Sequence, residues 1–535
     1  MLWNNYFPYD KPREQQTRSI EKVLEEFKNG KRYAVVECGT GVGKSAIGLT
    51  IARYLNNNSE FELEKNRGAY FLTTQRVLQD QYYKDFKKTG IVSLSSSSNY
   101  LCSKSNSGET CKDIATLLRT SNYPKKFEGC KFDCCYKRTK REFIEGQLGI
   151  TNFAYFLTEI NYSGKITPKR VLVIDEAHNL ENELTRFVEI SVSQYFSEKI
   201  LKLKVPELKT QFQTFNWIKG TYFTKLKSKI DHIEKQIDKL GLSSKIKDFK
   251  NLTNQFEMLK SHKGKIERFI SLYDKENWVF DIIENDKRYK KFSFRPIDIS
   301  NYSHEYLFNH ADYVVFMSAT IIHHEGFIET IGIDPDKTVI VKEKSPFDPE
   351  KRPLIYSPSG HMSMKNINST LPVMTKAIKE ILKEHKDAKG IIHAHSIKVA
   401  KYLTQNIKDP RLILAYGADR EKMLEKHIQS KRPTVLISPS MSEGVDLKGD
   451  LSKFQVLCKV PFPYLGDKAC RKKMNKWKWW YDAQTVRTIV QSIGRSIRSE
   501  NDEAITYILD ADWKRIKGKA KHMFPVDFFD NYHEF

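Results

Sequence analysis

Two kinds of hydrophobic spacing alternate along the 535-residue chain. Short apolar runs, such as residues 33–36 and 171–174, have the composition of buried strands. Apolar residues at four-residue spacing, such as Ile47, Ile51 and Leu55, predict a helix after the first of these strands. Short strands that alternate with helices are typical of a parallel sheet, so we expect an α/β fold.

The same alternation returns after a strand that ends in Ser318, Ala319 and Thr320. Helix-like segments such as "VMTKAIKEILKEH" separate five further strand-like segments, which are "KGIIHAHS", "RLILAYG", "PTVLISPS", "FQVLCKVPF" and "AITYILD". The second half of the chain is therefore predicted to form its own mostly parallel α/β sheet.

A long helical stripe lies between the two predicted sheets. Its apolar positions are Leu226, Ile230, Ile233, Ile237 and Leu240, and a similar pattern continues through Leu252, Phe256, Leu259, Ile266 and Ile270. A stripe of this kind is normally core packing, so we expect a helical hairpin here.

Composition restricts the class of protein. Several domains are expected, because single cores stop growing near about 250–300 residues. No apolar run approaches the roughly 20 residues of a membrane span, and the first residues lack an apolar signal segment, so we expect a cytoplasmic protein without membrane contact. The net charge of +23 favours a polyanionic partner such as nucleic acid, although a lysine-rich genome would produce the same surplus.

A glycine-rich loop, "CGTGVGKS", joins a predicted strand to a predicted helix at residues 38–45. Such loops wrap backbone N–H groups around phosphates at the start of the helix. Lys44 can reach the β and γ phosphates, and the Ser45 hydroxyl can bind Mg²⁺. The expected phosphate-binding residues are Gly39, Thr40, Gly41, Gly43, Lys44 and Ser45.

Two further motifs complete a site for ATP hydrolysis. In "VLVIDEAHNL" a buried strand ends in Asp175, which can hold Mg²⁺ through water, and Glu176, which can direct the attacking water. In "QSIGRSIRS", helical spacing would place Gln491, Arg495 and Arg498 on one face. The two arginines can then neutralise the transferred phosphate from a facing domain. The alternative for this motif is an exposed basic helix.

Five of the eight cysteines lie within residues 102–135. A disulfide framework is disfavoured in a cytoplasmic protein. Four thiolates suit either zinc or an iron–sulfur cluster. A structural zinc site usually has two short cysteine pairs and this stretch has one, but the residues alone leave both metals open.

A basic stretch rich in tryptophan, "KACRKKMNKWKWWYDAQTVR", precedes the arginine motif. Basic groups that neutralise phosphates, together with rings that stack on bases, bind single strands without sequence preference. Trp477, Trp479 and Trp480 can equally pack a helix onto the second domain, with at least one ring buried. The sequence leaves the two readings equal.

Five motifs in order resemble the superfamily 2 DNA helicases of the XPD/DinG type: "AVVECGTGVGKS", "VLVIDEAHNL", "VVFMSAT", "SMSEGVDLKG" and "QSIGRSIRS". The likeness covers almost the whole chain. It includes "SPFD", "VPFPY" and "FPYDKPREQQ", whose Arg13 and Gln16 fit the family's R-x-x-Q pattern. The departures are Cys38, Ser45 for the commoner Thr, Leu447 for an aromatic residue, and "HAHS". None removes a catalytic group.

The resemblance implies an α/β fold of two RecA-like parallel-sheet domains, the first interrupted by a [4Fe–4S] cluster domain and a mainly helical Arch domain. The expected boundaries are residues 1–92, 149–189 and 301–325 for the first RecA-like domain, 93–148 for the cluster domain, 190–300 for the Arch and 326–535 for the second RecA-like domain. The implied cluster ligands are Cys102, Cys111, Cys130 and Cys134, with Cys134 preferred to Cys135 because of Tyr136.

The resemblance also implies an ATP-dependent DNA helicase for DNA repair, replication or recombination. Its cofactors would be ATP, Mg²⁺ and the cluster, with Gln16 and Asp446 in the nucleotide site. We expect a prokaryotic or phage monomer that moves 5′ to 3′ on single-stranded DNA and unwinds forked or tailed duplex DNA. Two alternatives are an RNA helicase of the DEAH kind, which the cysteines argue against, and an ATP-driven nucleic-acid-binding switch without strand separation.

Overall fold

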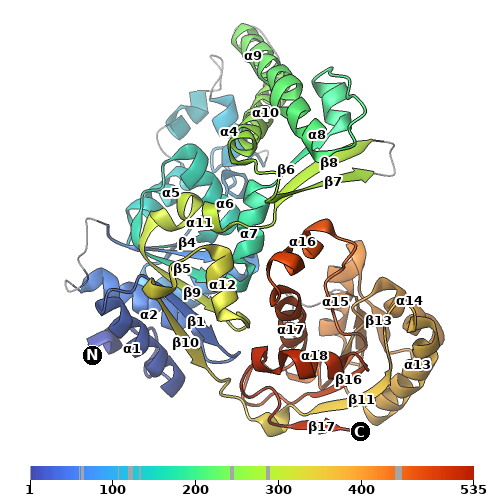
Figure 1. Cartoon of the computed structure of the whole chain (residues 1–535). Helices are drawn as coiled ribbons and strands as arrows, with labels where there is room; N and C mark the ends of the chain where they lie inside the picture. The colour runs from blue at the N-terminus through green and yellow to red at the C-terminus, as the bar shows by residue number, and fades with distance from the viewer. Residues whose placement is uncertain are drawn as a thin grey trace.

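A computed structural model of the chain describes residues 2–58, 61, 66–105, 108–118, 125–131, 134–240, 246–284, 289–439, 447 and 449–535. Two α/β lobes lie beside each other, and a third body of helices and strands stands on the first lobe (Figure 1). Among the described residues, each lobe contains a seven-stranded sheet, and the third body contains a three-stranded sheet. The predicted α/β fold with two large sheets is confirmed.

The sheet of lobe 1 is entirely parallel, with strand order β10-β1-β9-β5-β2-β4-β3. Its strands are β1 (Tyr33–Cys38), β2 (Ala69–Thr73), β3 (Val92–Ser93), β4 (Leu148–Asn152), β5 (Lys169–Asp175), β9 (Ala311–Ser318) and β10 (Thr338–Glu343). The register pairs Glu37 with Ser318 and Asp175 with Met317. The carboxyl ends of β1, β5 and β9 therefore meet at one edge of the sheet.

Helices cover both faces of this sheet, which is why its central strands are apolar throughout. One face carries α1 (Glu14–Lys28), α2 (Lys44–Asn57) and α3 (Arg76–Phe86). The other face carries α6 (Phe153–Thr158), α7 (Leu180–Val188), α11 (Ser300–Tyr306) and α12 (His324–Ile331).

The sheet of lobe 2 is also parallel, with strand order β13-β14-β12-β15-β16-β11-β17. Its strands are β11 (Leu354–Gly360), β12 (Gly390–His393), β13 (Leu412–Leu414), β14 (Val435–Ser438), β15 (Phe454–Leu457), β16 (Ile505–Asp510) and β17 (Tyr532–Glu534). Its helices are α13 (Ile367–Glu384), α14 (Ile397–Asn406), α15 (Arg420–Gln429), α16 (Lys468–Lys476), α17 (Trp480–Ile493) and α18 (Trp513–Ala520). No helix in the described part of the chain is both long and apolar enough to cross a membrane.

Two segments are inserted into lobe 1. The first, between β3 and β4, contains α4 (Cys111–Leu117) and α5 (Cys135–Glu145). The second, between α7 and α11, is called the Arch insertion below. Its helices are α8 (Gln211–Trp217), α9 (Phe223–Leu240) and α10 (Ile246–Leu272), and its antiparallel strands are β6 (Ile190–Ser193), β7 (Trp278–Glu284) and β8 (Lys290–Pro296).

The Arch insertion confirms the predicted helical hairpin, which α9 and α10 form. Its three-stranded sheet was not predicted. Buried and partly buried residues alternate in β6, where Ile190 and Val192 are buried, and in β8, where Phe292 and Phe294 are buried, but β7 shows no such alternation.

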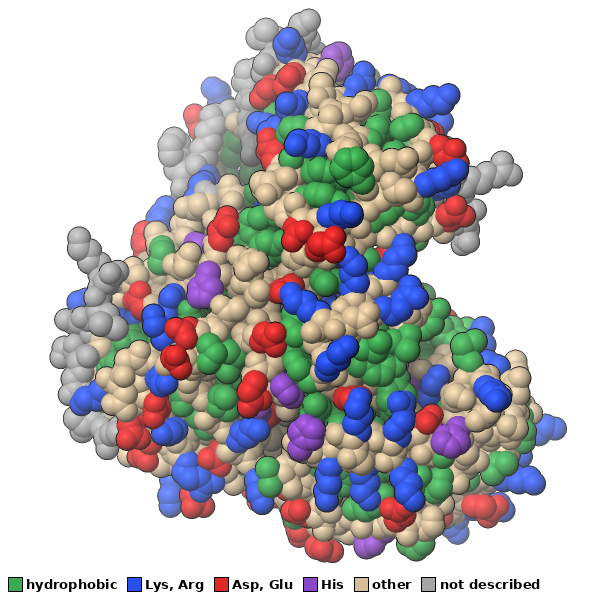
Figure 2. All heavy atoms as spheres, viewed as in Figure 1, with side chains coloured by type: hydrophobic (Ala, Val, Ile, Leu, Met, Phe, Trp, Pro, Cys, Tyr) green, Lys and Arg blue, Asp and Glu red, His purple; other side chains and the backbone are tan. Residues whose placement is uncertain are grey.

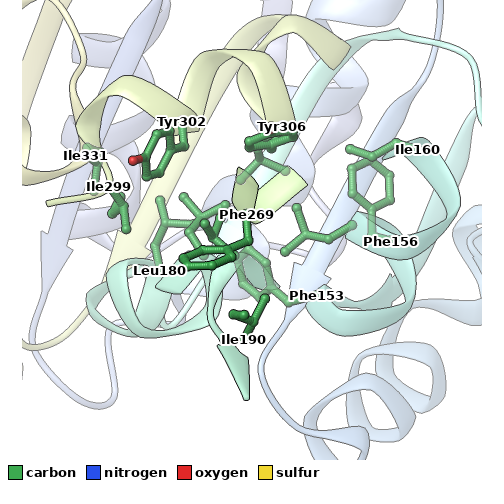
Figure 3. Close-up of a cluster of buried hydrophobic side chains, with 14 of the residues drawn as sticks. Phe153, Phe156, Ile160, Leu180, Ile190, Phe269, Ile299, Tyr302, Tyr306 and Ile331 are labelled. Atoms are coloured by element: carbon green, nitrogen blue, oxygen red, sulfur yellow. The ribbon is translucent and has the colours of Figure 1, made fainter. Parts of the chain in front are cut away.

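The Arch insertion shares a hydrophobic core with lobe 1. Phe269 of α10 belongs to the same buried cluster as Leu180 of α7 and Phe153 of α6 (Figure 3). Leu172 and Phe316 of the lobe 1 sheet extend that cluster to the strands. Because this packing is continuous, the insertion is built on lobe 1 rather than tethered to it.

The expected boundary between residues 325 and 326 is wrong. β10 lies beyond it, yet β10 pairs in parallel with β1, from Tyr33 opposite Thr338 to Cys38 opposite Glu343. An apolar run such as residues 338–341 predicts a buried strand but does not say which of two sheets it joins. Lobe 1 therefore extends at least to residue 343.

Replacing Phe269 by Ala tests the shared core. Phe269 is fully buried and its ring centroid lies 4.8 Å from that of Phe294 and 5.0 Å from that of Trp278. We expect Phe269→Ala to lower the free energy of unfolding by about 3–5 kcal/mol, measured by chemical denaturation. The matched control is Phe212→Ala in the same insertion, where the side chain is 63% exposed and little change is expected. Equal stability of the two variants would contradict a shared core.

Candidate active site between the lobes

A cavity of about 560 Å³ lies between the lobes at the carboxyl edge of the lobe 1 sheet. Predicted residues from three distant motifs line it: Gly39, Thr40, Gly41 and Glu176 from lobe 1, and Gln491, Arg495 and Arg498 from lobe 2. Lys44 lies within electrostatic reach of Asp175 and Glu176. The structure therefore brings most of the predicted nucleotide site together.

The glycine loop between β1 and α2 requires its glycines. Gly41 and Gly43 both have φ of +85°, which side-chain-bearing residues rarely adopt. A Cβ atom on Gly41 would come within 2.0 Å of the Phe347 ring. The Gly41 carbonyl accepts a hydrogen bond from the Arg13 guanidinium, and the Thr40 carbonyl accepts one from the Ser345 hydroxyl at 3.2 Å. The loop is thus held from both sides.

Gln16 lies behind the glycine loop. Its side-chain amide donates to the Gly43 carbonyl at 3.2 Å and accepts from the Arg13 backbone N–H at 2.8 Å. Gln16 is 5% exposed, so both contacts are largely shielded from water. In this structure the amide braces the loop, and its predicted contact with the nucleotide stays a prediction.

The two carboxylates at the end of β5 differ in their electrostatics. Burial raises the pKa of Asp175 to about 7, and the adjacent Glu176 adds to the rise. Burial would also raise the pKa of Glu176, but the facing groups, the His178 ring first and then Lys44, hold it below its usual range. Glu176 has φ of +50°, a strained conformation for a residue with a side chain. Glu176 lines the cavity, and one of its carboxylate oxygens lies 3.4 Å from His178 Nδ1.

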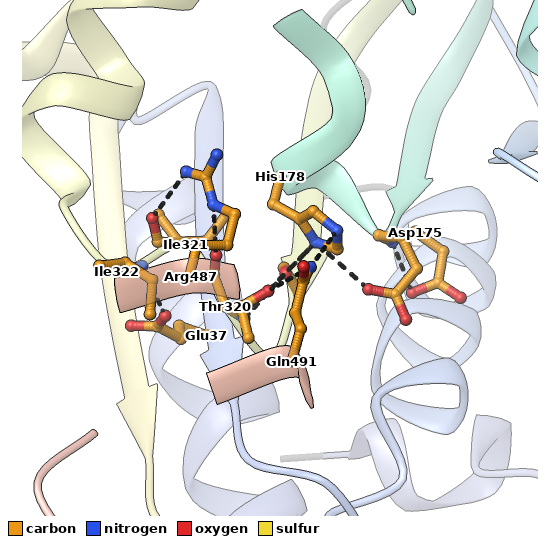
Figure 4. Close-up of polar contacts among 10 residues, drawn as sticks. Glu37, Asp175, His178, Thr320, Ile321, Ile322, Arg487 and Gln491 are labelled. Carbon is orange, nitrogen blue, oxygen red and sulfur yellow. Dashed lines mark hydrogen bonds and ion pairs between the residues drawn. The ribbon is translucent and has the colours of Figure 1, made fainter. Parts of the chain in front are cut away.

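His178 connects the lobes. Its Nδ1 lies 2.8 Å from the Ser318 hydroxyl and 3.4 Å from a Glu176 carboxylate oxygen, and its Nε2 accepts from the Gln491 amide at 2.8 Å (Figure 4). Burial lowers the pKa of His178 to about 4, so the ring is neutral at physiological pH. With Nε2 accepting, the ring proton resides on Nδ1, which faces Ser318 and Glu176.

A second contact crosses the cleft four residues earlier on α17. Arg487 donates to the carbonyls of Thr320 and Ile321, each at 3.2 Å (Figure 4). Glu37 at the end of β1 accepts from the Ile322 N–H at 2.9 Å and pairs with His324 at 2.9 Å. Sequence reasoning assigned no role to Arg487 or to His178. His178 was visible in "DEAH", and Arg487 is the last residue of the basic stretch, but nothing in the sequence indicates its contact with lobe 1.

Arg495 and Arg498 reach the cavity from a turn. α17 ends at Ile493 with Gly494 as its C-cap, so the predicted continuous helical face is wrong. Asp502 shapes the turn by accepting from the backbone N–H groups of Arg498 at 2.8 Å and Ser499 at 2.7 Å. Both arginines still lie close enough to Glu176 to lower its pKa.

Comparison with known proteins agrees with this geometry. The model of the helicase C-terminal domain matches residues 374–526, and that of the type III restriction enzyme res subunit matches residues 10–204. A probable ATP-dependent helicase of Methanocaldococcus jannaschii is 25% identical over 98% of this chain and 96% of its own. The ATP-dependent DNA helicase YoaA of Escherichia coli is 21% identical over 94% of this chain and 92% of its own.

Solved structures share the fold. An XPD helicase structure aligns with a TM-score of 0.65 and 17% identity, covering 98% of this chain and all of its own. The Xpd4 structure of S. tokodaii aligns with a TM-score of 0.59 and 14% identity, also over 98% of this chain and all of its own. Together these matches support an XPD/DinG-like helicase of superfamily 2.

Five of the eight cysteines lie in the first insertion, between β3 and β4. Cys102 and Cys130 are buried in one small cluster with Cys134 against it, and the Cys111 and Cys135 sulfurs lie 3.4 Å apart. Burial raises the pKa of Cys130, and the neighbouring Cys102 adds to the rise. Burial also raises the pKa of Cys111, to about 12, and the contact with Cys135 adds to the rise. Among the described residues, no three His, Cys, Asp or Glu side chains are grouped as a metal site requires.

The three tryptophans of the basic stretch pack against protein. Trp477 is 3% and Trp480 is 9% exposed, and the Trp479 ring stacks on His323 with centroids 4.6 Å apart. The prediction of at least one buried ring is confirmed, and packing is the better of the two readings. Asp446 lies outside the described residues, and its neighbour Leu447 is fully buried.

Gly41→Ala tests the crowding of the glycine loop. We expect it to be about 1–3 kcal/mol less stable to chemical denaturation than Gly90→Ala, because both sites have φ above +80° but only Gly41 meets the Phe347 ring. Adding Phe347→Ala should recover part of the loss. If Gly41→Ala and Gly90→Ala unfold alike, the contact with Phe347 does not constrain the loop.

Proposed function

We propose that this protein is an ATP-dependent DNA helicase that moves 5′ to 3′ along single-stranded DNA and separates forked or tailed duplexes. The observation that carries the proposal is the cavity that joins the glycine loop and Glu176 to the arginine motif of the other lobe. A site divided between two lobes converts hydrolysis into relative motion, which a translocating motor needs. DNA is favoured over RNA by the name of the E. coli relative, a DNA helicase.

Each site residue has a proposed role in one cycle. Lys44, Ser45 and Asp175 would hold Mg·ATP, since they combine a phosphate-reaching cation with two oxygen ligands for Mg²⁺. Glu176, kept ionised by the surrounding cations, would direct the attacking water. Arg495 and Arg498 would stabilise the charge on the transferred phosphoryl group when the cleft closes. Each chain carries both halves of the site, so we propose that a monomer suffices.

We also propose that the first insertion holds a [4Fe–4S] cluster. Cys102, Cys130 and Cys134 share a small, partly apolar cluster, and Cys111 lies against Cys135 in the same insertion, so thiols suitable as iron ligands are close together. Burial beside neighbouring thiols raises the pKa of Cys111 and of Cys130, and a bound cation would favour the thiolate forms. Cys102, Cys111, Cys130 and Cys134 are the proposed ligands. The cluster would brace a domain that buries little apolar surface of its own.

Lys44→Ala with a tailed duplex tests the helicase proposal. The wild type should hydrolyse ATP faster with single-stranded DNA than with RNA and should unwind a duplex with a 5′ tail. Lys44→Ala should lose at least about 100-fold in stimulated hydrolysis, because the γ phosphate loses its main cationic contact. The matched control, Lys342→Ala, removes an exposed lysine outside the cavity and should leave both activities unchanged.

Three results would oppose this proposal in different ways. Normal stimulated hydrolysis by Lys44→Ala would refute the site assignment. Stimulation by RNA alone would favour an RNA helicase. Hydrolysis without unwinding of any tailed duplex would favour an ATP-driven switch.

Anaerobic purification followed by an absorbance spectrum and iron, sulfide and zinc analysis tests the cluster. We expect about four irons per chain in the wild type and in Cys135→Ser. Cys134→Ser should lose most of the iron, because Cys134 packs beside Cys102 and Cys130 whereas Cys135 lies against Cys111. Bound zinc, or iron retained by Cys134→Ser and lost by Cys135→Ser, would overturn the proposed ligand set.

A further inference from the structure

Helix α16 is strongly basic, yet its lysines lie against protein acceptors. The helix contains Lys468, Lys472, Lys473 and Lys476, and it lies between β7 of the Arch insertion and α17 of lobe 2 (Figure 1). Basic and acidic side chains stand beside each other at the inner end of the notch between the insertion and lobe 2 (Figure 2). This juxtaposition is not explained by phosphate binding alone.

Each of these lysines contacts lobe 1 or the Arch insertion. Lys468 donates to the Phe280 carbonyl at 2.9 Å and lies 3.3 Å from an Asp281 carboxylate oxygen. Lys472 donates to the carbonyls of Glu276 at 3.1 Å and Trp278 at 3.3 Å.

The last two turns of α16 make carboxylate pairs with two further elements. Lys473 pairs with Glu181 on α7, and Lys476 pairs with Asp298 just before α11. The side chains of Lys473 and Glu181 are only 10% and 13% exposed, so this pair is well shielded from water and salt.

The N-terminus of α16 also contacts the Arch insertion. Asp467 is the N-cap and accepts from the Ala469 N–H at 2.7 Å. The same carboxylate oxygen accepts from the Arg295 guanidinium of β8 at 2.6 Å. The capping residue of a lobe 2 helix is therefore also an ion-pair partner of the Arch insertion.

Aromatic contacts extend the attachment to α12. The Trp477 indole N–H donates to Glu329 at 2.8 Å. Trp479 stacks on His323, and a Cβ atom on Gly326 would come within 2.2 Å of the indole. α17 begins at the next residue and carries Arg487 and Gln491 into the cleft. A displacement of α16 is thus transmitted to residues of the active site.

We propose that α16 is an electrostatic latch that fastens lobe 2 to the Arch insertion and α7, and thereby positions α17 against the nucleotide site. Lys473 is its central positioning residue. The latch couples the opening of the cleft to the Arch insertion: when lobe 2 moves away from lobe 1, these ion pairs must separate or the insertion must follow. The coupling to hydrolysis rests on the proposed function, whereas the latch itself is a property of the protein without nucleotide.

A charge swap tests the latch in the nucleotide-free full chain. Dyes attached through genetically encoded azides at the exposed positions Lys225 on α9 and Lys379 on α13 would report the distance between the Arch insertion and lobe 2. Lys473→Glu should shift the single-molecule energy-transfer distribution toward longer distances. The double variant Lys473→Glu with Glu181→Lys should restore the wild-type distribution. Lys478→Glu, an exposed lysine two residues beyond the helix, is the matched control and should change nothing.

Salt gives a second test that needs no folding-sensitive variant. Raising NaCl from about 0.1 M to about 1 M shortens the screening length from about 10 Å to about 3 Å. The wild-type distribution should then shift in the same direction as that of Lys476→Met, which removes the pair with Asp298. If neither about 1 M NaCl nor the Lys476→Met substitution shifts the energy-transfer distribution, the latch is overturned.

Kinetics separate positioning from mere folding. Lys473→Glu should lower kcat for ATP hydrolysis by about threefold or more while changing KM less, because the arginines after α17 are proposed to act in the transition state, and the charge swap should restore kcat. Failure of the swap to restore both distance and kcat would overturn the proposal. The distance measurement uses no ATP or DNA, so it remains decisive even if Lys44→Ala shows that the helicase proposal is wrong.

Discussion

The hydrogen bond between Gln491 and His178 joins two lobes whose described strands form separate sheets, and the site exists only while such contacts hold the lobes together. The contact depends on a neutral imidazole, which burial enforces by lowering the pKa of His178 to about 4. A neutral ring can accept from lobe 2 and donate within lobe 1 at the same time. The groups that would neutralise a phosphate on one side are thereby aligned with the carboxylates on the other.

The segment that connects the two lobes packs against the glycine loop. β10 adds to the lobe 1 sheet beside β1, and the segment after it places Ser345 on Thr40 and Phe347 on Gly41. Because interiors are close-packed, a shift of this segment cannot leave the loop unchanged. A movement of lobe 2 is therefore transmitted to the glycine loop by this packing as well as by the contacts across the cleft.

Part of the large positive charge is paired with acceptors of the protein itself. Lys468, Lys472, Lys473 and Lys476 contact acceptors of lobe 1 and the Arch insertion, so they are not simply a surface for a polyanion. The Arch insertion in turn shares its core with lobe 1 through Phe269. Lobe 1 and the insertion form one packed body, and α16 is the place where lobe 2 meets it.

Residue type and local spacing in the sequence were enough to predict the α/β fold, the glycine loop, the acidic strand end and the helical hairpin of α9 and α10. Each of these depends on residues close together in the chain, such as the glycines beside Lys44 or the apolar run before Asp175. Only the tertiary structure decided that β10 belongs to lobe 1, that Arg495 lies in a turn beyond α17, that Trp477 is buried, and that His178 contacts Gln491. These outcomes depend on which distant surfaces fit together, and residue type and spacing along the chain carry no information about that fit.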